Sequence, residues 1–233
     1  MSKKTQTRDD FMVQSARPDI VSQEIWQKQI DLLREKEKSL TRARDEVNAL
    51  RRRLPMVKVD KNYVFTGERG NASLLDLFEG RKQLIVYHFM FGPDWKAGCP
   101  GCSWVTDGMS HPAHLNARDT SIALISRAPL ERLLNFRDRM GWSLPWYSSL
   151  NGAFNFDFGA TIDDRENHVV SVFLREDDEV YRTYYTDRRG VEHLGSHWAY
   201  LDMTPYGRQE VWEDSPKGWP QGDKNWTRRH DEY

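Results

Sequence analysis

The sequence predicts an α/β fold in which a parallel core of strands carries an antiparallel edge. Two almost continuous apolar runs, 84–91 and 120–126, are typical of central strands that are buried on both faces. A segment with helical character follows each run, and this alternation is typical of a parallel sheet. Residues 169–174 and 180–185 form two further strands joined by a short acidic turn, which predicts a hairpin at the edge.

A long amphipathic helix is expected over residues 22–54, before the sheet begins. Its apolar stripe repeats every seven residues and consists of Trp26, Leu33, Leu40, Val47 and Leu54. Ser22 is a suitable N-cap, Pro55 ends the pattern, and the basic run 51–53 suits the negative end of the helix dipole. The main expectation is that the stripe lies on the domain of the same chain. Because about 33 helical residues outreach a domain of this size, we also expect a homodimer contact through this helix.

Shorter elements complete the expected domain. They are a half-buried strand over 57–65, a turn over 66–71, a helical turn over 74–78, a helix from Cys102 through Met109, a helix from Pro129 to Gly141, and a strand over 146–149. The chain then divides into a helical extension (1–54), an α/β domain (55–214) and a tail (215–233). Trp219 and Trp226 are the candidates to anchor the tail.

Charge and hydropathy exclude several classes of function. There are 34 basic and 35 acidic side chains, and this balance provides no general attraction to nucleic acid or to an anionic membrane. No apolar run approaches the roughly 20 residues of a membrane-spanning helix. The polar residues 1–10 do not resemble a secretory signal. The expected compartment is therefore the reducing cytoplasm, with neither nucleic acid nor membrane as partner.

The two cysteines of the chain lie together in the motif Cys99-Pro100-Gly101-Cys102. At the start of a helix, Cys99 meets unpaired backbone N–H groups and the positive end of the helix dipole, which lower the pKa of its thiol. Lys96 is expected to lower that pKa further. Cys102 lies one turn inward, where it can resolve a mixed disulfide. The pattern therefore predicts a redox-active dithiol, with Cys99 as nucleophile and Cys102 as resolving thiol.

Three other interpretations of the cysteine pair are weaker. A structural disulfide is disfavoured in a reducing compartment, and a peroxide-reducing cysteine would use the same thiolate on another substrate. A zinc site would need His111 and His114, in the spacing C-x2-C-x8-H-x2-H. If the helix runs on from Cys102, His111 lies about 13 Å along it, beyond ligand reach, unless the helix breaks at Gly108 or Ser110. We therefore expect neither a metal nor another cofactor.

Several conspicuous side chains are better explained by packing than by chemistry. His88 lies within a buried strand and is expected to be a core histidine, although its strand leads to the cysteines and keeps it eligible as a proton acceptor. Aromatic residues near strand ends are usually core, rather than the lining of a substrate groove; here they are Trp142, Trp146 and Tyr147. No motif surrounds the remaining histidines, which are His168, His193, His197 and His230.

Several long blocks of this sequence resemble a largely bacterial family of uncharacterised thioredoxin-like proteins, which are predicted dithiol–disulfide oxidoreductases. The blocks are TRARDEVNALRRRLPMVKVDKNYVF, LIVYHFMFGPDW with GCPGCS, SRAPLERLLNFRDRMGWSLPWYSS, GVEHL and LDMTPYGRQE, and the resemblance runs from about Leu40 to the final RRHDEY. It implies a thioredoxin-like fold with Cys99 as attacking and Cys102 as resolving thiol. The implied partners are a protein or small-molecule disulfide and a thiol electron donor.

Two departures from related patterns bear on function. Thioredoxins place a cis-proline opposite the dithiol, and Val170 occupies the matching position here. Peroxiredoxins place Pro and Thr seven and three residues before the reactive cysteine, where this chain has Gly92 and Lys96. A peroxiredoxin-like thiol peroxidase is therefore the second hypothesis. A third is a binding module that uses the long helix and has no catalytic turnover.

Overall fold

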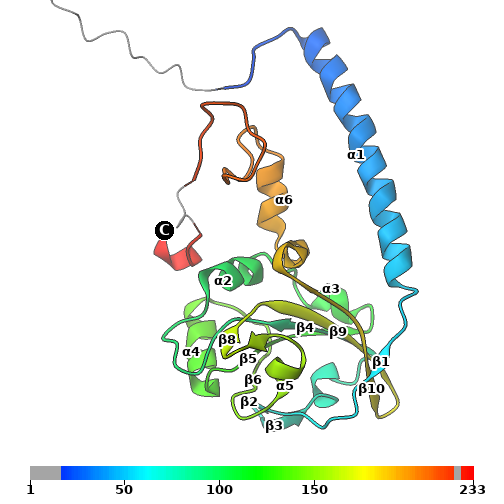
Figure 1. Cartoon of the computed structure of the whole chain (residues 1–233), viewed down its shortest axis with the longest axis vertical. Helices are drawn as coiled ribbons and strands as arrows, with labels where there is room; N and C mark the ends of the chain where they lie inside the picture. The colour runs from blue at the N-terminus through cyan, green and yellow to red at the C-terminus, as the bar shows by residue number, and fades with distance from the viewer. Residues whose placement is uncertain (1–16, 223–226) are drawn as a thin grey trace, which may run out of the picture.

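An eight-stranded sheet forms the centre of the computed structural model, which describes residues 17–222 and 227–233. Its strands are β1 Val57–Lys58, β2 Val64–Gly67, β3 Gly70–Ser73, β4 Gln83–His88, β5 Thr120–Ser126, β6 Trp146–Ser148, β9 Val169–Glu176 and β10 Glu179–Asp187. They lie in the order β1-β10-β9-β4-β5-β6-β2-β3 (Figure 1). A separate ribbon pairs β7 Thr161–Ile162 with β8 Arg165–Glu166.

The predicted core strands occupy the middle of this sheet. β4 pairs in parallel with β5 and antiparallel with β9, so it has a neighbour on each side. β5 in turn pairs in parallel with β6, and β9 forms the expected antiparallel hairpin with β10. The largely apolar character of β4 and β5 suits this position, because both faces of the sheet are covered there. The predicted strand over 120–126 and the predicted hairpin are confirmed.

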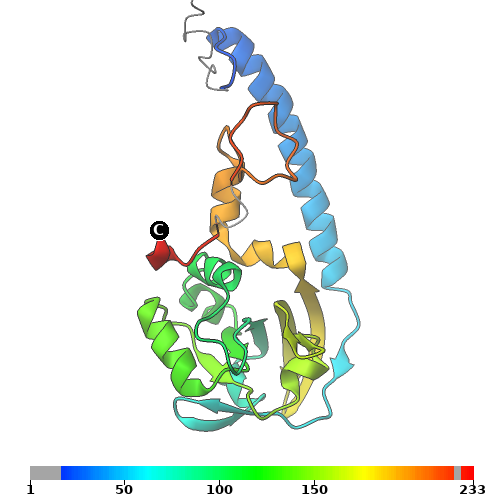
Figure 2. The same cartoon turned by 60° about the vertical axis from the view of Figure 1, so that its left-hand side comes forward.

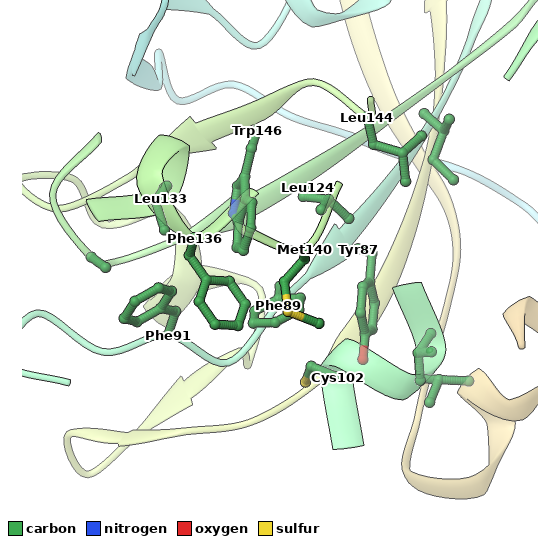
Figure 3. Packing of buried hydrophobic residues seen from close by; sticks show 14 of the residues in the cluster. Tyr87, Phe89, Phe91, Cys102, Leu124, Leu133, Phe136, Met140, Leu144 and Trp146 are labelled. Carbon is green, nitrogen blue, oxygen red and sulfur yellow. The ribbon is translucent and has the colours of Figure 1, made fainter. Parts of the chain in front are cut away.

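Helices cover both faces of the sheet, and the sheet separates the interior into two cores. The helical elements are α1 Gln23–Arg51, η1 Asp76–Phe78, α2 Pro100–Asp107, α3 Ala113–Asn116, α4 Leu130–Arg139, α5 Phe154–Asp157, η2 Arg188–Leu194, α6 Ser196–Asp202 and η3 His230–Glu232. One core joins β4 and β5 to α2 and α4, and an aromatic group around Phe89, Phe136 and Trp146 fills it (Figure 3). The second core lies under η1 and α5.

This arrangement is the thioredoxin-like fold that the sequence predicts. A β4–α2–β5 unit supplies the parallel pair, and the β9–β10 hairpin adds antiparallel strands on the other side of β4. The helix that carries the cysteine pair follows β4 directly after a loop. The dithiol thus lies beyond the carboxyl end of a central strand, where open α/β sheets place their sites.

The single strand expected over 57–65 is wrong, because the chain there forms two strands on opposite sides of the sheet. β1 pairs with β10, whereas β2 pairs with β6. The polar residues 60–62 separate the two. They connect β1 at one edge of the sheet to β2 on the other side, instead of continuing a single strand. The turn expected over 66–71 is the connection of the β2–β3 hairpin, whose Gly70 has a φ of 98°.

The long helix α1 exists but does not pack as the main expectation stated. The hydroxyl of Ser22 accepts a hydrogen bond from the Ile25 N–H at 3.4 Å, which confirms the cap, and the helix ends at Arg51, before Pro55. None of its residues is buried. Figures 1 and 2 show it running away from the sheet as a separate rod, which at 29 residues is about 43 Å long. Arg51, over the ring of Tyr184, contacts the domain.

Several boundaries differ from the prediction for local reasons. α2 ends at Asp107 rather than Met109, with Gly108 as its C-cap. Gly108 approaches the backbone between η2 and α6 so closely that a Cβ would lie 2.7 Å from the Gly195 Cα. Pro129 is the N-cap of α4 rather than its first residue. The apolar periodicity did not reveal the short helices α3, α5, η2 and α6.

The tail and the N-terminus can be compared with the prediction only in part. Trp219 packs edge-on against Tyr206, with ring centroids 5.5 Å apart, whereas Trp226 and residues 1–10 lie outside the described residues. In the part of the chain that the structure describes, no helix is both long and apolar enough to cross a membrane.

Candidate functional site

The cysteine pair lies at the first turn of α2, as its sequence context predicts. Cys99 is the N-cap residue with φ −58° and ψ 132°, and Pro100 takes the first helical position, where no N–H is needed. The Cys99 carbonyl accepts hydrogen bonds from both the backbone N–H and the hydroxyl of Ser103, each at 3.0 Å. These bonds fix the turn that separates the two thiols.

The backbone of Met90, just after β4, holds both cysteines. The Cys99 N–H donates to the Met90 carbonyl at 3.0 Å, and the Met90 N–H donates to the Cys102 sulfur at 3.5 Å. The backbone that follows the central strand therefore fixes the positions of both cysteines. Both are free, so the structure describes the reduced dithiol.

The two thiols have opposite environments. The pKa of Cys99 is lowered to about 6, mainly by a hydrogen bond from the Cys102 thiol, with help from the backbone N–H groups of Cys102 and Gly101 and from the charge of Arg229. Burial raises the pKa of Cys102, which is 2% exposed, and the neighbouring Cys99 raises it further. At neutral pH Cys99 is thus the thiolate and Cys102 the thiol. The expected charge of Lys96 is not among these causes, and that side chain is exposed.

Tyr87 is the side chain of β4 that faces the dithiol (Figure 3). Its ring is fully buried, and its hydroxyl makes no hydrogen bond of normal geometry with any described residue. The hydroxyl nevertheless interacts with the Cys102 thiol and acts to lower the pKa of that group, against the effect of burial. Burial, followed by the charges of the dithiol, raises the pKa of Tyr87 itself. A neutral phenol therefore lies ready to stabilise a Cys102 thiolate.

The loop between β4 and α2 is held from two sides. A guanidinium N–H of Arg132 donates to the carbonyls of Pro93 and Trp95, at 2.5 and 2.9 Å. Gly98 lies against the ring of Phe89 so closely that a Cβ would come within 2.5 Å of it. Only glycine fits this approach, so the residue before Cys99 has a fixed place.

A cavity of about 520 Å³ opens beside Cys99. Its floor is apolar and includes Tyr87, Met90, Val105 and Trp198. Charged and polar groups form its other side, and they are His168, Arg188, Arg189 and Glu192. Both cysteines border the cavity, but Cys102 is only 2% exposed, so Cys99 is the thiol that a substrate of modest size can reach.

His168 is a residue of this site that the sequence analysis missed. It immediately precedes β9, and its Nε2 lies 3.3 Å from the Arg188 carbonyl oxygen. The sequence analysis instead placed Val170 opposite the dithiol, but Val170 is a buried core residue inside the strand. No described peptide bond is cis. The sequence signal for His168 is its place directly before the predicted strand 169–174.

His88 cannot serve the dithiol, because it points to the other face of β4. It is fully buried, stacks on Phe154 with ring centroids 5.2 Å apart, and its Nε2 lies 3.1 Å from the Ser171 hydroxyl. Burial lowers the pKa of His88 to about 3, so the ring is neutral. It is a core histidine, as expected, although its Nδ1 lacks a hydrogen-bond partner among the described residues.

The histidines of the zinc hypothesis do not join the cysteines. α2 does end early, next to Gly108, as that hypothesis required. His111 and His114 are nevertheless exposed, and His111 Nδ1 accepts a hydrogen bond from the Ala113 N–H at 3.2 Å. Within residues 17–222 and 227–233, no three His, Cys, Asp or Glu side chains gather as metal ligands would.

The three aromatic residues considered for a substrate groove lie elsewhere. Trp146 is buried, with 2% of its surface exposed, and packs on Phe89. Trp142 covers the same aromatic group and donates its indole N–H to Asp107 at 2.8 Å. Tyr147 packs with the second core, and none of the three lines the dithiol cavity.

The fold and the site together define a thioredoxin-fold protein with a reduced C-x-x-C pair at a helix N-terminus. The chain belongs to the family described as "Bacterial protein of unknown function (DUF899)", whose model matches residues 15–233. No curated protein matches the chain.

Among solved structures, the chain is similar to PrxQ from Xylella fastidiosa, with 11% identity, a TM-score of 0.45, and 59% of this chain and 90% of that chain covered. Peroxidoxin BcpB from Mycobacterium tuberculosis shares 13% identity with a TM-score of 0.46, over 57% of this chain and 85% of that one. A candidate thiol:disulfide interchange protein DsbE from Chlorobium tepidum shares 12% identity with a TM-score of 0.40, over 60% and 93%.

Proposed function

We propose that the protein is a thiol–disulfide oxidoreductase that uses Cys99 and Cys102. The observation that carries the proposal is the division of the two thiols, one with a pKa of about 6 beside an open cavity and one buried with a raised pKa. A nucleophile must be ionised and accessible, whereas a resolving thiol must be close and protected. The pair meets both requirements.

The reaction begins with the Cys99 thiolate. Its sulfur attacks one sulfur of a substrate disulfide, the substrate S–S bond breaks, and the first substrate thiolate leaves and takes up a proton from water. The mixed disulfide between Cys99 and the substrate is the intermediate. At this stage the cavity beside Cys99 holds the bound half of the substrate.

Cys102 completes the reaction. It loses its proton, its thiolate attacks the Cys99 sulfur, and the second substrate thiolate leaves as the Cys99–Cys102 disulfide forms. The substrate has gained two electrons and the dithiol has lost them. A thiol electron donor then returns the protein to its reduced state by two exchanges of the same kind. Tyr87 assists the attack of Cys102 on the Cys99 sulfur by stabilising the Cys102 thiolate.

Insulin reduction with dithiothreitol as electron donor tests the proposal. We expect turnover by the natural chain and none by Cys99→Ser. Consumption of hydrogen peroxide under the same conditions tests the peroxidase alternative, which the exposed Lys96 disfavours because it supplies no hydroxyl where peroxiredoxins have threonine. Peroxide turnover without insulin turnover would overturn the proposal in favour of a thiol peroxidase. Absence of both would favour a binding module.

A further inference from the structure

The last residues of the described chain lie against the helix that carries the dithiol. Figures 1 and 2 show η3 beside α2, although 130 positions separate Arg229 from Cys99. Arg229 donates from Nε and Nη2 to the carbonyl oxygen of Gly98, at 3.1 and 2.5 Å. Gly98 immediately precedes the reactive cysteine, so this contact acts on the backbone at the entry to the site.

Three further contacts dock this C-terminal segment, residues 227–233. The Arg139 guanidinium on α4 pairs with both oxygens of Asp231, at 2.7 and 2.9 Å. His230 Nδ1 lies 2.8 Å from an oxygen of Asp107 on α2. The indole N–H of Trp104 donates to the Tyr233 hydroxyl at 3.0 Å. A single exposed ion pair contributes little, but several contacts to two helices together define one docked geometry.

The guanidinium of Arg229 is a fixed charge rather than a solvated one. Its side chain is 16% exposed, pairs with Glu232 at 2.7 Å and lies over the Phe136 ring, 5.8 Å from the centroid. A charge held in partly apolar surroundings acts on its neighbours more strongly than one in water. Arg229 is accordingly among the groups that lower the pKa of Cys99.

We propose that Arg229 is a positioning residue for the dithiol. It fixes the Gly98 carbonyl, and with it the backbone that enters Cys99, and it holds a positive charge where the Cys99 thiolate forms. The C-terminal segment thereby tunes a thiol distant in sequence. The inference rests on the proposed function in one respect, namely that Cys99 is the reactive thiol.

Arg229→Gln and Arg228→Gln form a matched pair for the test. Arg228 carries the same charge in the same segment, and its backbone N–H donates to the Tyr233 hydroxyl, while its exposed side chain makes no hydrogen bond or ion pair with the described residues. The rate of Cys99 alkylation is measured against pH for the natural chain and for both variants. Circular dichroism checks that each is folded.

We expect Arg229→Gln to raise the apparent pKa of Cys99 by about one unit, so that alkylation near pH 5 slows about tenfold. Arg228→Gln should leave the profile unchanged, and Arg229→Lys, which keeps the charge but loses the paired donors, should fall between them. Equal profiles for the two glutamine variants would overturn the inference. Alkylation does not depend on turnover, so a failed insulin assay with a shifted Arg229→Gln profile would refute the oxidoreductase and leave the positioning role standing.

Discussion

At the scale of single residues, the chemistry depends on the first turn of α2, which gives two identical side chains different environments and opposite pKa shifts. Cys99 caps the helix beside N–H donors, whereas Cys102 enters the aromatic core. With a pKa of about 6, the Cys99 thiol is about nine-tenths ionised at pH 7. Its pKa lies below the 8.5 or so of a free cysteine, so the ionisation of Cys99 stabilises the fold fully above about pH 8.5, and this stabilisation disappears as the pH falls through 6.

The first prediction is an asymmetry between single-cysteine variants. Cys102→Ser should accumulate stable mixed disulfides with its substrates, because no resolving thiol remains, and Cys99→Ser should accumulate none. Alkylation of Cys102→Ser should show an apparent pKa below the 8.5 or so of a free cysteine, since the backbone N–H groups of positions 101 and 102 and the charge of Arg229 remain beside Cys99. If Cys99→Ser proves the faster and more acidic variant, the roles are reversed.

A second prediction concerns the hydroxyl of Tyr87. Tyr87→Phe keeps the buried ring and removes the group that stabilises a Cys102 thiolate. The hydroxyl makes no hydrogen bond of normal geometry in the reduced protein, but a bond that it donates to the thiolate as that group forms would contribute about 1.5 to 3 kcal/mol. Closure of the Cys99–Cys102 disulfide should therefore slow about tenfold or more in the variant. Stopped-flow mixing of the reduced protein with a small disulfide measures this step.

Tyr63→Phe is the matched control for that variant. Tyr63 is also a buried tyrosine, but its hydroxyl donates to Asp157 at 2.8 Å in the second core, away from the dithiol. It should leave closure unchanged. Equal closure rates for Tyr87→Phe and the natural chain would show that the phenol takes no part in the resolving step.

The residues of the site differ in how far the sequence reveals them. Cys99, Pro100 and Cys102 were predictable because spacing and helix-start chemistry are local properties. Arg229 and His168 were not, because they reach the dithiol only through the β9 topology and the docking of the C-terminal segment. Lys96, a neighbour in sequence, was expected to lower the pKa of Cys99 further but is not among the groups that do so.

At the scale of elements, the apolar pattern predicted the central strands of the sheet. It failed for strands whose partners lie far away in the sequence. The strands at 84–88 and 120–126 lie in the middle of the sheet, and their composition alone indicates burial. Residues 57–65 alternate as one strand would, yet they supply the edge strand β1 and, on the other side of the sheet, the strand β2, because each half finds a different partner. Short helices such as α3 and α5 carry too few turns for a period to be read.

The helix α1 raises the third prediction, which concerns oligomeric state. It has no buried residue, and a helix without tertiary contacts gains little stability from packing. Its Leu40 and Val47 face an apolar groove of about 560 Å³ whose other wall includes Ile85, Val172 and Tyr184. We expect the helix of a second copy to cover this stripe, giving a homodimer.

Light scattering across a concentration series measures that prediction. The natural chain should approach twice the monomer mass, and the double variant Leu40→Glu with Val47→Glu should remain a monomer. Lys38→Glu, on the opposite face of α1, is the control and should dimerise like the natural chain. A monomeric natural chain at high concentration would refute the homodimer.

At the scale of the whole molecule, the parts of the chain most distant in sequence meet at one end of the sheet. β4 supplies Tyr87 and leads to the dithiol, β9 begins beside it at His168, and η2 contributes the charged wall of the cavity. Residues 227–233 close the arrangement by docking on α2 and α4. The sequence predicted the fold that brings the strands together, but not the return of the tail to the site.

The proposed thiol–disulfide exchange requires that Cys99 and Cys102 form a reversible two-electron couple. A low Cys99 pKa stabilises the reduced form and raises the reduction potential, so the value should lie above that of a dithiol with two ordinary thiols. The comparison is with thioredoxin at about −270 mV and protein disulfide isomerase at about −180 mV. A midpoint between these two is expected.

Titration of the natural chain in glutathione or dithiothreitol redox buffers, with trapped thiols counted by mass, measures this couple most directly. We expect one cooperative loss of two thiols with a midpoint between about −270 and about −180 mV, and neither Cys99→Ser nor Cys102→Ser should show it. A chain that keeps both thiols throughout the titration, or that loses them only irreversibly, would refute the proposed redox couple.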